Sequence, residues 1–201
     1  MENKKGAGIV LGLAAGLTLI LGGVGMTGRA TGGSIGCHIK NGAAENGVVP
    51  VKAFCEWPVS PDKLNRLLSR YEGHADVFSA LAESKVLTQS GKNARVLQKH
   101  RAKGISDRDV VVEWTVAATR GGNRYAWARA DNQSATSGQN IVVPVHNGHW
   151  EVRPGDGGGS ELIYRSHYLP GGTVPEFLVR MFQSSGTEAV LRDFRAIAEK
   201  S

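Results

Sequence analysis

The 201-residue chain is 41% hydrophobic and 21% charged, values close to those of globular proteins, and its formal net charge is +6. This length suffices for one domain with an N-terminal extension. The excess of basic residues fits either a solvated surface or attraction to anionic lipid headgroups. Because the basic residues are scattered and no aromatic residues are interleaved with them, the composition argues against a nucleic-acid-binding protein.

The first 30 residues have the pattern of an export segment. Lys4-Lys5 precede an uncharged, apolar stretch over 6–28, and Gly28-Arg29-Ala30 offers small residues for cleavage. The stretch, at about 20 residues, is also long enough to span a bilayer. We therefore predict that 1–30 is either a cleaved signal peptide or a retained membrane anchor, with a segment of neither kind as the remaining alternative. Export would place the protein in the periplasm or outside the cell, and an anchor would hold it at the inner membrane.

The segment 31–47 is rich in glycine and polar residues, and we expect a flexible linker there. Cys37 lies in this segment, whereas Cys55 lies on a predicted strand. In an exported protein the two cysteines could form a disulfide. Two unpaired thiols, with Cys55 simply buried, are the alternative.

The remainder of the chain, 48–201, is expected to fold as one domain that begins with a strand and two helices. Alternating apolar residues over 48–57 predict the strand. Ser60 as N-cap and Pro61 in the first turn predict the start of a helix, whose apolar stripe includes Leu64 and Leu68. A short second helix is expected over 74–81.

A series of strands follows, interrupted by turns that contain glycine or asparagine. The expected strands are 86–89, 95–101, 109–118, 124–130, 141–146, 149–153 and 161–168. The Asn147-Gly148 pair predicts a tight hairpin between the fifth and sixth of these strands. Thr173 as N-cap and Pro175 then predict a long final helix over 174–200, within which Gly186 is a potential break. This order indicates an α+β fold with a mainly antiparallel sheet.

The order of elements and several short motifs resemble the START-type (SRPBCC, helix-grip, polyketide cyclase-like) domain family. The motifs are Trp57-Pro-Val-Ser-Pro-Asp-Lys-Leu, Leu68-Ser-Arg-Tyr-Glu-Gly-His, Ile105-Ser-Asp-Arg-Asp-Val and the final hairpin and helix entry from Trp150 to Pro175. The resemblance implies a helix-grip fold, in which a curved antiparallel sheet wraps around the long C-terminal helix. It also implies non-catalytic binding, and transfer, of a lipid or other hydrophobic small molecule by a START-like domain over 48–201. Some members are cyclases or aromatases, so an enzyme of that kind is the alternative.

A cavity of this family lies between the sheet and the last helix, and apolar or aromatic residues that point inward are candidates to line it. Packing in an ordinary core is the alternative for each of them. The candidate ligand-binding residues are Val110, Val112, Trp114, Tyr125, Trp127 and Tyr164 on strands, and Phe177 and Met181 on the final helix.

The sequence carries little sign of other chemistry. The six histidines do not have metal-ligand spacing, so no metal site is expected, and no cofactor motif is present. The Asp107-Arg-Asp109 cluster is more typical of a structural tie at a strand end than of a catalytic carboxylate pair. We therefore assign no catalytic residue.

Overall fold

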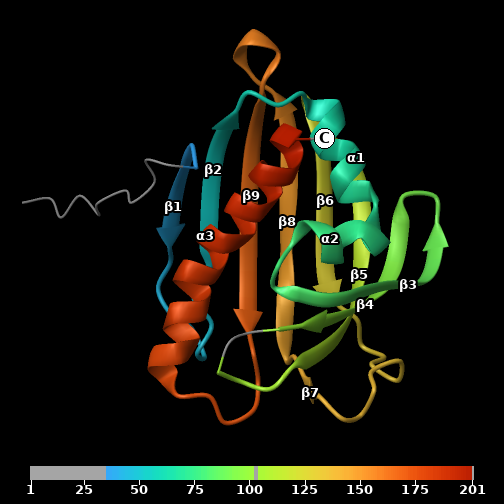
Figure 1. Ribbon diagram of the computed structural model, residues 1–201, viewed down its shortest axis with the longest axis vertical. Helices are drawn as coiled ribbons and strands as arrows, with labels where there is room; N and C mark the ends of the chain where they lie inside the picture. Colours follow the sequence, from blue (N-terminus) through green and yellow to red (C-terminus); the bar gives the residue numbers. More distant parts are fainter. Residues whose placement is uncertain (1–34, 102–103, 201) are drawn as a thin grey trace, which may run out of the picture.

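The computed structural model describes residues 35–101 and 104–200 (Figure 1). The predicted signal peptide or anchor, 1–30, lies outside the described residues. Within the described ranges, no helix has the length and apolar character needed to cross a membrane.

In the described residues, nine strands form a single sheet. In chain order they are β1 (Cys37–Asn41), β2 (Val51–Trp57), β3 (Leu81–Ser90), β4 (Asn93–His100), β5 (Arg108–Thr119), β6 (Gly122–Arg129), β7 (Ile141–Val142), β8 (Val145–Pro154) and β9 (Ser160–Leu169). The order across the sheet is β1-β2-β9-β8-β6-β5-β4-β3, and each neighbouring pair along this path is antiparallel. The short β7 adds to β5 in parallel.

The three α-helices that the structure describes within 35–101 and 104–200 lie on one face of the sheet, and the longest crosses it diagonally (Figure 1). They are α1 (Pro61–Ser69), α2 (His74–Val77) and α3 (Glu176–Lys200), and two short 3-10 turns occupy Tyr71–Gly73 and Asp156–Gly158. The sheet curves around α3, so the predicted α+β helix-grip fold is confirmed. Helix α3 continues through Gly186 without a break.

The hydrophobic core lies between the sheet and these helices. Leu64 and Leu68 of α1 are fully buried, as the apolar stripe predicts. Near the C-terminal end of α3, Leu191, Phe194 and Ala198 are also fully buried. The core therefore holds the C-terminal half of α3 firmly against the sheet.

The structure adds a strand where the sequence suggests a linker. Strand β1 pairs with β2 along the sheet edge, with Cys37 opposite Cys55, and the two cysteines form a disulfide. Both cysteine side chains are buried, and Nε1 of Trp57 donates to the carbonyl oxygen of Ile35 at 2.8 Å just before β1. The sequence did not predict this strand because its segment is rich in glycine and polar residues. Only alternate positions of an edge strand face the core, so the strand needs few apolar residues.

The predicted hairpin at Asn147-Gly148 is wrong, because β8 runs through both residues as one strand. Gly148 pairs with Trp127 on β6 and with Ser166 on β9. A Cβ atom at position 148 would overlap the carbonyl oxygen of Arg165 and lie 2.6 Å from Cζ2 of Trp127. Glycine is therefore required here for the close approach of the Trp127 ring, which is a common reason for glycine inside a strand.

We predict that Gly148→Ala lowers the free energy of unfolding by at least about 1–3 kcal/mol, the usual cost of overpacking, because backbone and an indole must both move. Gly186→Ala is the matched control. A Cβ at Gly186 meets no atom within 4 Å, and alanine is the better helix former by about 0.5–1 kcal/mol. Urea unfolding of both variants measures the difference, and equal stabilities would contradict this role of Gly148.

Candidate functional site: a cavity between helix and sheet

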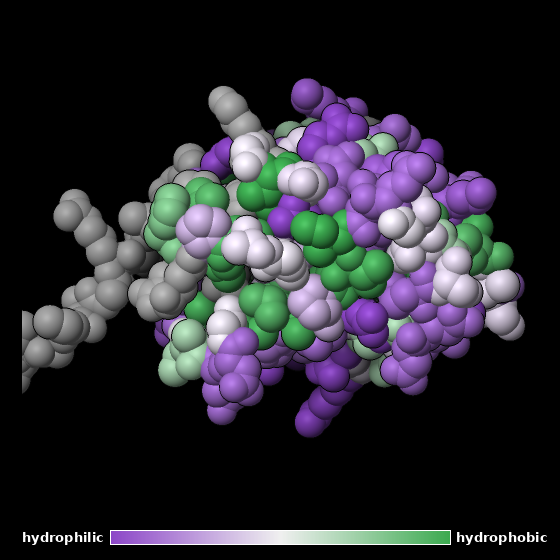
Figure 2. Space-filling model, turned by 90° about the horizontal axis from the view of Figure 1, so that it is seen from below, coloured by the Kyte–Doolittle hydropathy of each residue, from purple (hydrophilic) through white to green (hydrophobic). Residues whose placement is uncertain are grey.

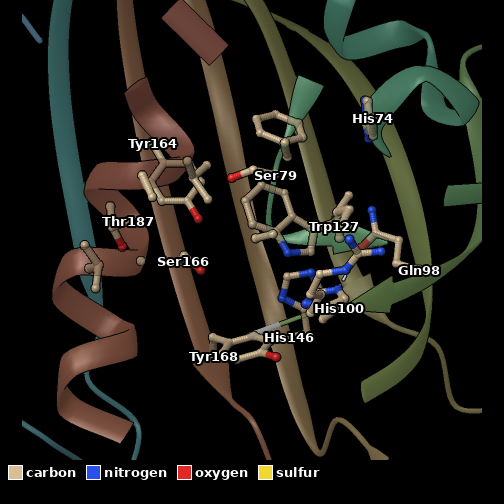
Figure 3. A pocket seen from close by; sticks show the side chains of 18 of the residues that line it. His74, Ser79, Gln98, His100, Trp127, His146, Tyr164, Ser166, Tyr168 and Thr187 are labelled. Atoms are coloured by element: carbon tan, nitrogen blue, oxygen red, sulfur yellow. Dashed lines mark hydrogen bonds between the residues drawn. The ribbon is translucent and has the colours of Figure 1, made fainter. Parts of the chain in front are cut away.

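A cavity of about 630 Å³ lies between one face of the sheet and the middle of α3 (Figure 3). Its volume is within the range typical of small-molecule binding sites. The residues that line it come from β2 and the residues before it, α2 and the connection to β3, the central strands, and α3. They are Val49, Val51, His74, Phe78, Ser79, Ala80, Leu81, Gln98, His100, Arg101, Arg108, Trp114, Trp127, His146, Trp150, Tyr164, Ser166, Tyr168, Ser185, Gly186, Thr187, Ala189 and Val190.

The C-terminal half of α3 packs tightly against the sheet beside the cavity. Phe194 contacts the rings of Trp57, Phe78 and Trp150, with centroid distances of 5.7, 5.8 and 5.1 Å. One turn earlier, Val190 is only half-buried and faces the cavity. Between Phe194 and Val190 the helix thus passes from the packed core to the wall of the cavity.

The opening of the cavity is marked by lining residues that are exposed to solvent. Ser79, between α2 and β3, and Ser185, on α3, are both exposed. The carboxylate of Asp193 accepts hydrogen bonds from the backbone nitrogen and hydroxyl of Ser79, at 2.8 and 2.6 Å, which join α3 to this connection. Figure 2 shows apolar surface among polar side chains on the lower end of the molecule, the end that carries β7 in Figure 1.

Aromatic side chains form a continuous wall along the sheet side of the cavity. The ring of Trp127 lies 5.2 Å from that of Trp114 and 5.9 Å from that of Tyr164, and Tyr164 lies 4.3 Å from Trp150. Rigid rings of this kind offer a large apolar contact area together with polar atoms at their edges.

A cluster of polar rings occupies one end of this wall (Figure 3). His146 and Tyr168 are paired across β8 and β9. The His100 ring lies 4.9 Å from His146 and is stacked on Tyr168 at 5.5 Å. Nε2 of His100 is also 3.4 Å from Oε1 of Gln98. The imidazoles of His100 and His146 and the phenol of Tyr168 therefore lie together. They come from the C-terminal ends of β4 and β9 and the N-terminal end of β8.

His74 occupies a second polar position, beside α2. Its Nε2 is 3.1 Å from the carbonyl oxygen of Leu68, and its ring lies edge-on to Trp114 at 5.3 Å. The side chain is buried to 1% exposure. The orientation of the His74 ring is fixed by its aromatic neighbours and by its contact with the Leu68 carbonyl oxygen.

Burial keeps these titratable groups uncharged near neutral pH. It lowers the pKa values of His74 and His100 to about 4, against opposing effects of the Leu68 carbonyl and the Asp109 charge, respectively. Burial and the neighbouring His100 lower the pKa of His146 well below its usual value. Burial also raises the pKa values of Tyr164 and Tyr168 to about 12. The cavity wall is thus polar in places but carries no charge on these rings.

The buried guanidinium of Arg108 is held by backbone oxygens. Its nitrogens donate to the carbonyl groups of Ser106, Pro170 and Gly171. Asp109 beside it accepts hydrogen bonds from Ser137 and Asn140 in the loop before β7. The Asp107-Arg-Asp109 cluster therefore ties the loops around β5 together through Arg108 and Asp109, the structural role that the sequence favoured.

The structure brings three of the candidate ligand-binding residues to the cavity: Trp114, Trp127 and Tyr164. Val110 and Val112 are fully buried in the core and do not line it. The Tyr125 hydroxyl lies 3.1 Å from Oδ1 of Asn65 under α1, on the other side of the core.

The two candidates on α3 lie near its N-terminal end. Phe177 is 69% exposed and does not line the cavity. Met181 belongs to α3, but its side chain lies outside the described part of the structure. Among the side chains of α3 that the structure describes, those that line the cavity lie between Ser185 and Val190.

His74, His100, His146 and Tyr168 line the cavity but were not among the candidates from the sequence. His146, Gly148 and Trp150 alternate along β8, as do Tyr164, Ser166 and Tyr168 along β9, so period-two spacing places each set on one face. The mistaken turn at Asn147-Gly148 separated His146 from Trp150 and concealed this pattern. Among the described residues, no group of histidine, cysteine and acidic side chains could hold a metal ion.

Comparison with known proteins gives the family. A family described as "Polyketide cyclase / dehydrase and lipid transport" matches residues 57–195. The chain belongs to this family. The match spans α1 to the C-terminal half of α3, and so includes both sides of the cavity.

A relative of similar sequence is the Pseudomonas aeruginosa protein named "Uncharacterized protein PA1579". It is 31% identical over 132 residues, which are 64% of this chain and 65% of that protein. The match therefore covers somewhat less than two thirds of the length of this relative.

Solved structures show the same fold at low sequence identity. The STAR-related lipid transfer protein of Xanthomonas axonopodis is 17% identical, with a TM-score of 0.74 over 82% of this chain and 94% of that one. Human StAR-related lipid transfer protein 5 is 11% identical, with a TM-score of 0.68 over 86% and 89%. The ZhuI aromatase/cyclase of a Streptomyces species is 14% identical, with a TM-score of 0.53 over 81% and 95%.

The buried histidines predict acid sensitivity. Below about pH 6.5 the imidazole of His74 takes a proton in the unfolded chain, whereas in the folded protein it does so only near its lowered pKa of about 4. The free energy of unfolding is therefore highest above pH 6.5. As the pH is lowered from there, it decreases by up to about 1.4 kcal/mol per pH unit for each such histidine. In urea titrations between about pH 6 and pH 5, His74→Phe should reduce this slope by about 1 kcal/mol per pH unit. An unchanged slope would contradict the buried, neutral state of His74.

Proposed function

We propose that this protein binds a lipid or another hydrophobic small molecule in the cavity between α3 and the sheet, without covalent chemistry. The observation that carries the proposal is the cavity itself, about 630 Å³ in volume and walled by Trp114, Trp127, Trp150 and Tyr164. Its apolar surface would leave water when a ligand enters, and this burial favours binding. Two of the similar folds belong to proteins named for lipid transfer.

Filling the cavity should weaken binding. Gly186 lines the cavity, and a side chain there would enter open space. We expect Gly186→Phe to weaken binding of the uncharged fluorescent probe phenylnaphthylamine about tenfold, because losing about 60 Å² of apolar contact at about 25 cal/mol per Å² has that effect.

Gly186→Ala is the control, since it adds a single methyl group at the same position and should retain most of the affinity. Fluorescence titration of the full-length protein measures both variants, and thermal unfolding checks that they remain folded. Normal probe binding by folded Gly186→Phe would contradict this location of the site.

A cyclase or aromatase activity is the second candidate function, and one specific observation favours it. His100, His146 and Tyr168 place groups that can donate and accept protons on the wall of an otherwise apolar cavity. A similar fold belongs to an aromatase/cyclase. If the protein cyclises a linear poly-β-ketone thioester, and folded His146→Gln does not, catalysis replaces binding as the function.

We also propose that the protein is exported to the periplasm or beyond, with 1–30 as its signal peptide or its inner-membrane anchor. The basic start and apolar stretch of this segment support export. The Cys37–Cys55 disulfide supports it too, because disulfides persist mainly in oxidising compartments. In that compartment, a domain that encloses a hydrophobic molecule could carry it across an aqueous gap. Transfer would then follow from binding.

Alkaline phosphatase fused after Ser201 should therefore be active in intact bacteria. Deletion of 6–28 is the control and should abolish this activity, because the enzyme needs an oxidising compartment to form its own disulfides. Equal activity with and without the deletion would contradict export by this segment.

A further inference from the structure

A row of basic side chains crosses the outer face of the sheet, which is the face opposite to the helices (Figure 1). Lys40 on β1 is paired with Lys52 on β2, and Lys52 is in turn paired with Arg165 on β9. Residues paired across neighbouring strands point to the same face of a sheet. The adjacent residues Ala53 and Tyr164 are buried on the helix side. The three basic side chains therefore point outward, and all three are exposed.

The charges of this row are not neutralised within the part of the chain that the structure describes, where none of the three side chains forms an ion pair. Glu151 on β8 is a diagonal neighbour of Arg165 on the same face. Its carboxylate already accepts hydrogen bonds from Arg124 and Arg153. This carboxylate is therefore engaged by two other cations and leaves the row uncompensated.

The other acidic side chains of the same strands and face lie further away. Glu56 and Glu161 are paired with each other, four residues along the strands from Lys52 and Arg165. Four residues of strand span about 13 Å, which is more than the Debye length at physiological salt. Like charges directly opposite each other destabilise a sheet. The row is thus a surface at which an anion would relieve repulsion.

The positive potential of the row extends onto the next strand. His149 on β8 is paired with Arg165, so it is the next side chain in the row. Burial and the charges of Arg124 and Arg165 lower its pKa, against the opposing effect of Glu151. The arginines around His149 therefore disfavour a further positive charge in the absence of an external anion.

Apolar side chains beside the row favour a lipid surface as the anionic partner. Phe54 on β2 and Ile163 on β9 are paired with each other on the outer face, two residues from Lys52 and Arg165, and both are half-buried. At a bilayer surface, apolar side chains and the stems of long basic ones enter the interface while the charges meet the phosphates. A row of cations next to partly exposed apolar groups suits this environment.

The course of the chain also brings this face toward a membrane. The described chain begins at Ile35, two residues before β1, which is the edge strand that carries Lys40. A segment that ends at residue 30 is separated from Ile35 by at most about 18 Å of extended chain. If 1–30 is retained as an anchor, the edge of the sheet with the basic row would lie within reach of the headgroups.

We propose that Lys40, Lys52 and Arg165 form a docking surface for a bilayer that contains anionic phospholipids. The surface lies on the face of the sheet opposite to the cavity, so this inference goes beyond the proposed binding function and does not depend on it. Ser79 and Ser185 mark the opening of the cavity on the helix side. Docking through the outer face therefore leaves the opening free for a hydrophobic molecule to enter or leave.

Lysine footprinting of the full-length protein tests this surface. Acetylation by a water-soluble reagent is followed by mass spectrometry in the presence of vesicles. Vesicles of phosphatidylcholine and phosphatidylglycerol in equal parts should slow the acetylation of Lys40 and Lys52 several-fold, whereas vesicles of phosphatidylcholine alone should not. Lys85 is exposed on β3, at the opposite edge of the sheet, and its rate should stay constant as the internal control. Because the readout is specific to position, it holds whether or not 1–30 inserts into the vesicles.

A pair of matched variants tests the role of charge. Arg165→Gln should raise the lipid concentration that half-protects Lys52 about fivefold, the contribution of one basic side chain at an anionic membrane surface. Arg66→Gln is the control, because it removes the same charge from an exposed position on α1, on the other side of the sheet, and should leave this concentration unchanged. Lys52→Gln, with Lys40 as the readout, is a second variant of the row. Thermal unfolding verifies that every variant is folded.

The outcomes separate this surface from the binding function. Equal protection of Lys40 and Lys52 by neutral and anionic vesicles, or protection by neither, overturns the docking surface. Protection by polyglutamate at a lower concentration than by anionic vesicles overturns the membrane as partner and assigns the row to an acidic protein. Arg165→Gln should bind phenylnaphthylamine normally. Failure of the wild-type protein to bind this probe overturns the binding function and leaves the docking surface intact.

Discussion

The contact of Phe194 with Trp57, Phe78 and Trp150 is the constraint on which the cavity depends. It anchors the C-terminal half of α3 in a tightly packed core, together with the fully buried Leu191 and Ala198. The sheet curves around α3, and one turn before Phe194 the half-buried Val190 faces the cavity instead of the core. The space left beside Val190 and Gly186 is therefore a consequence of the fold and not a local packing defect.

A cavity made in this way would be costly if it stayed empty, since its walls lose contacts that a packed core would supply. The side chains on its wall indicate a more selective purpose than bulk burial. Aromatic rings provide apolar area, while His74, His100 and His146 remain uncharged because burial lowers their pKa values. The same neutrality that suits an uncharged ligand makes the fold sensitive to acid, because the unfolded chain takes up protons that the cavity excludes.

Much of the fold, and part of the site, could be predicted from the sequence. Strict alternation on central strands identified Trp114, Trp127 and Tyr164, because side chains two residues apart share a face of the sheet. The apolar face of the last helix was visible too, but its pattern could not tell which half packs in the core. As a result Phe177 was a candidate although it is exposed, whereas Gly186 and Thr187, which line the cavity, were not. His146 and Tyr168 were missed because Gly148 has two possible roles, a turn or a close approach by another side chain. The choice between these two roles depends on the neighbouring strand β6, which places the Trp127 ring against Gly148.

The most direct test of this account is a crystal structure of the full-length protein with a long-chain methyl ketone that carries bromine at its far end. Anomalous scattering from bromine locates the chain without assumptions about the rest of the electron density. The account predicts bromine in the cavity between α3 and the sheet, toward the opening at Ser79 and Ser185, with the ligand against the wall formed by Trp114, Trp127, Trp150 and Tyr164. Bromine density confined to the outer surface of the protein, with the cavity filled by water or closed by the side chains of α3, would contradict it.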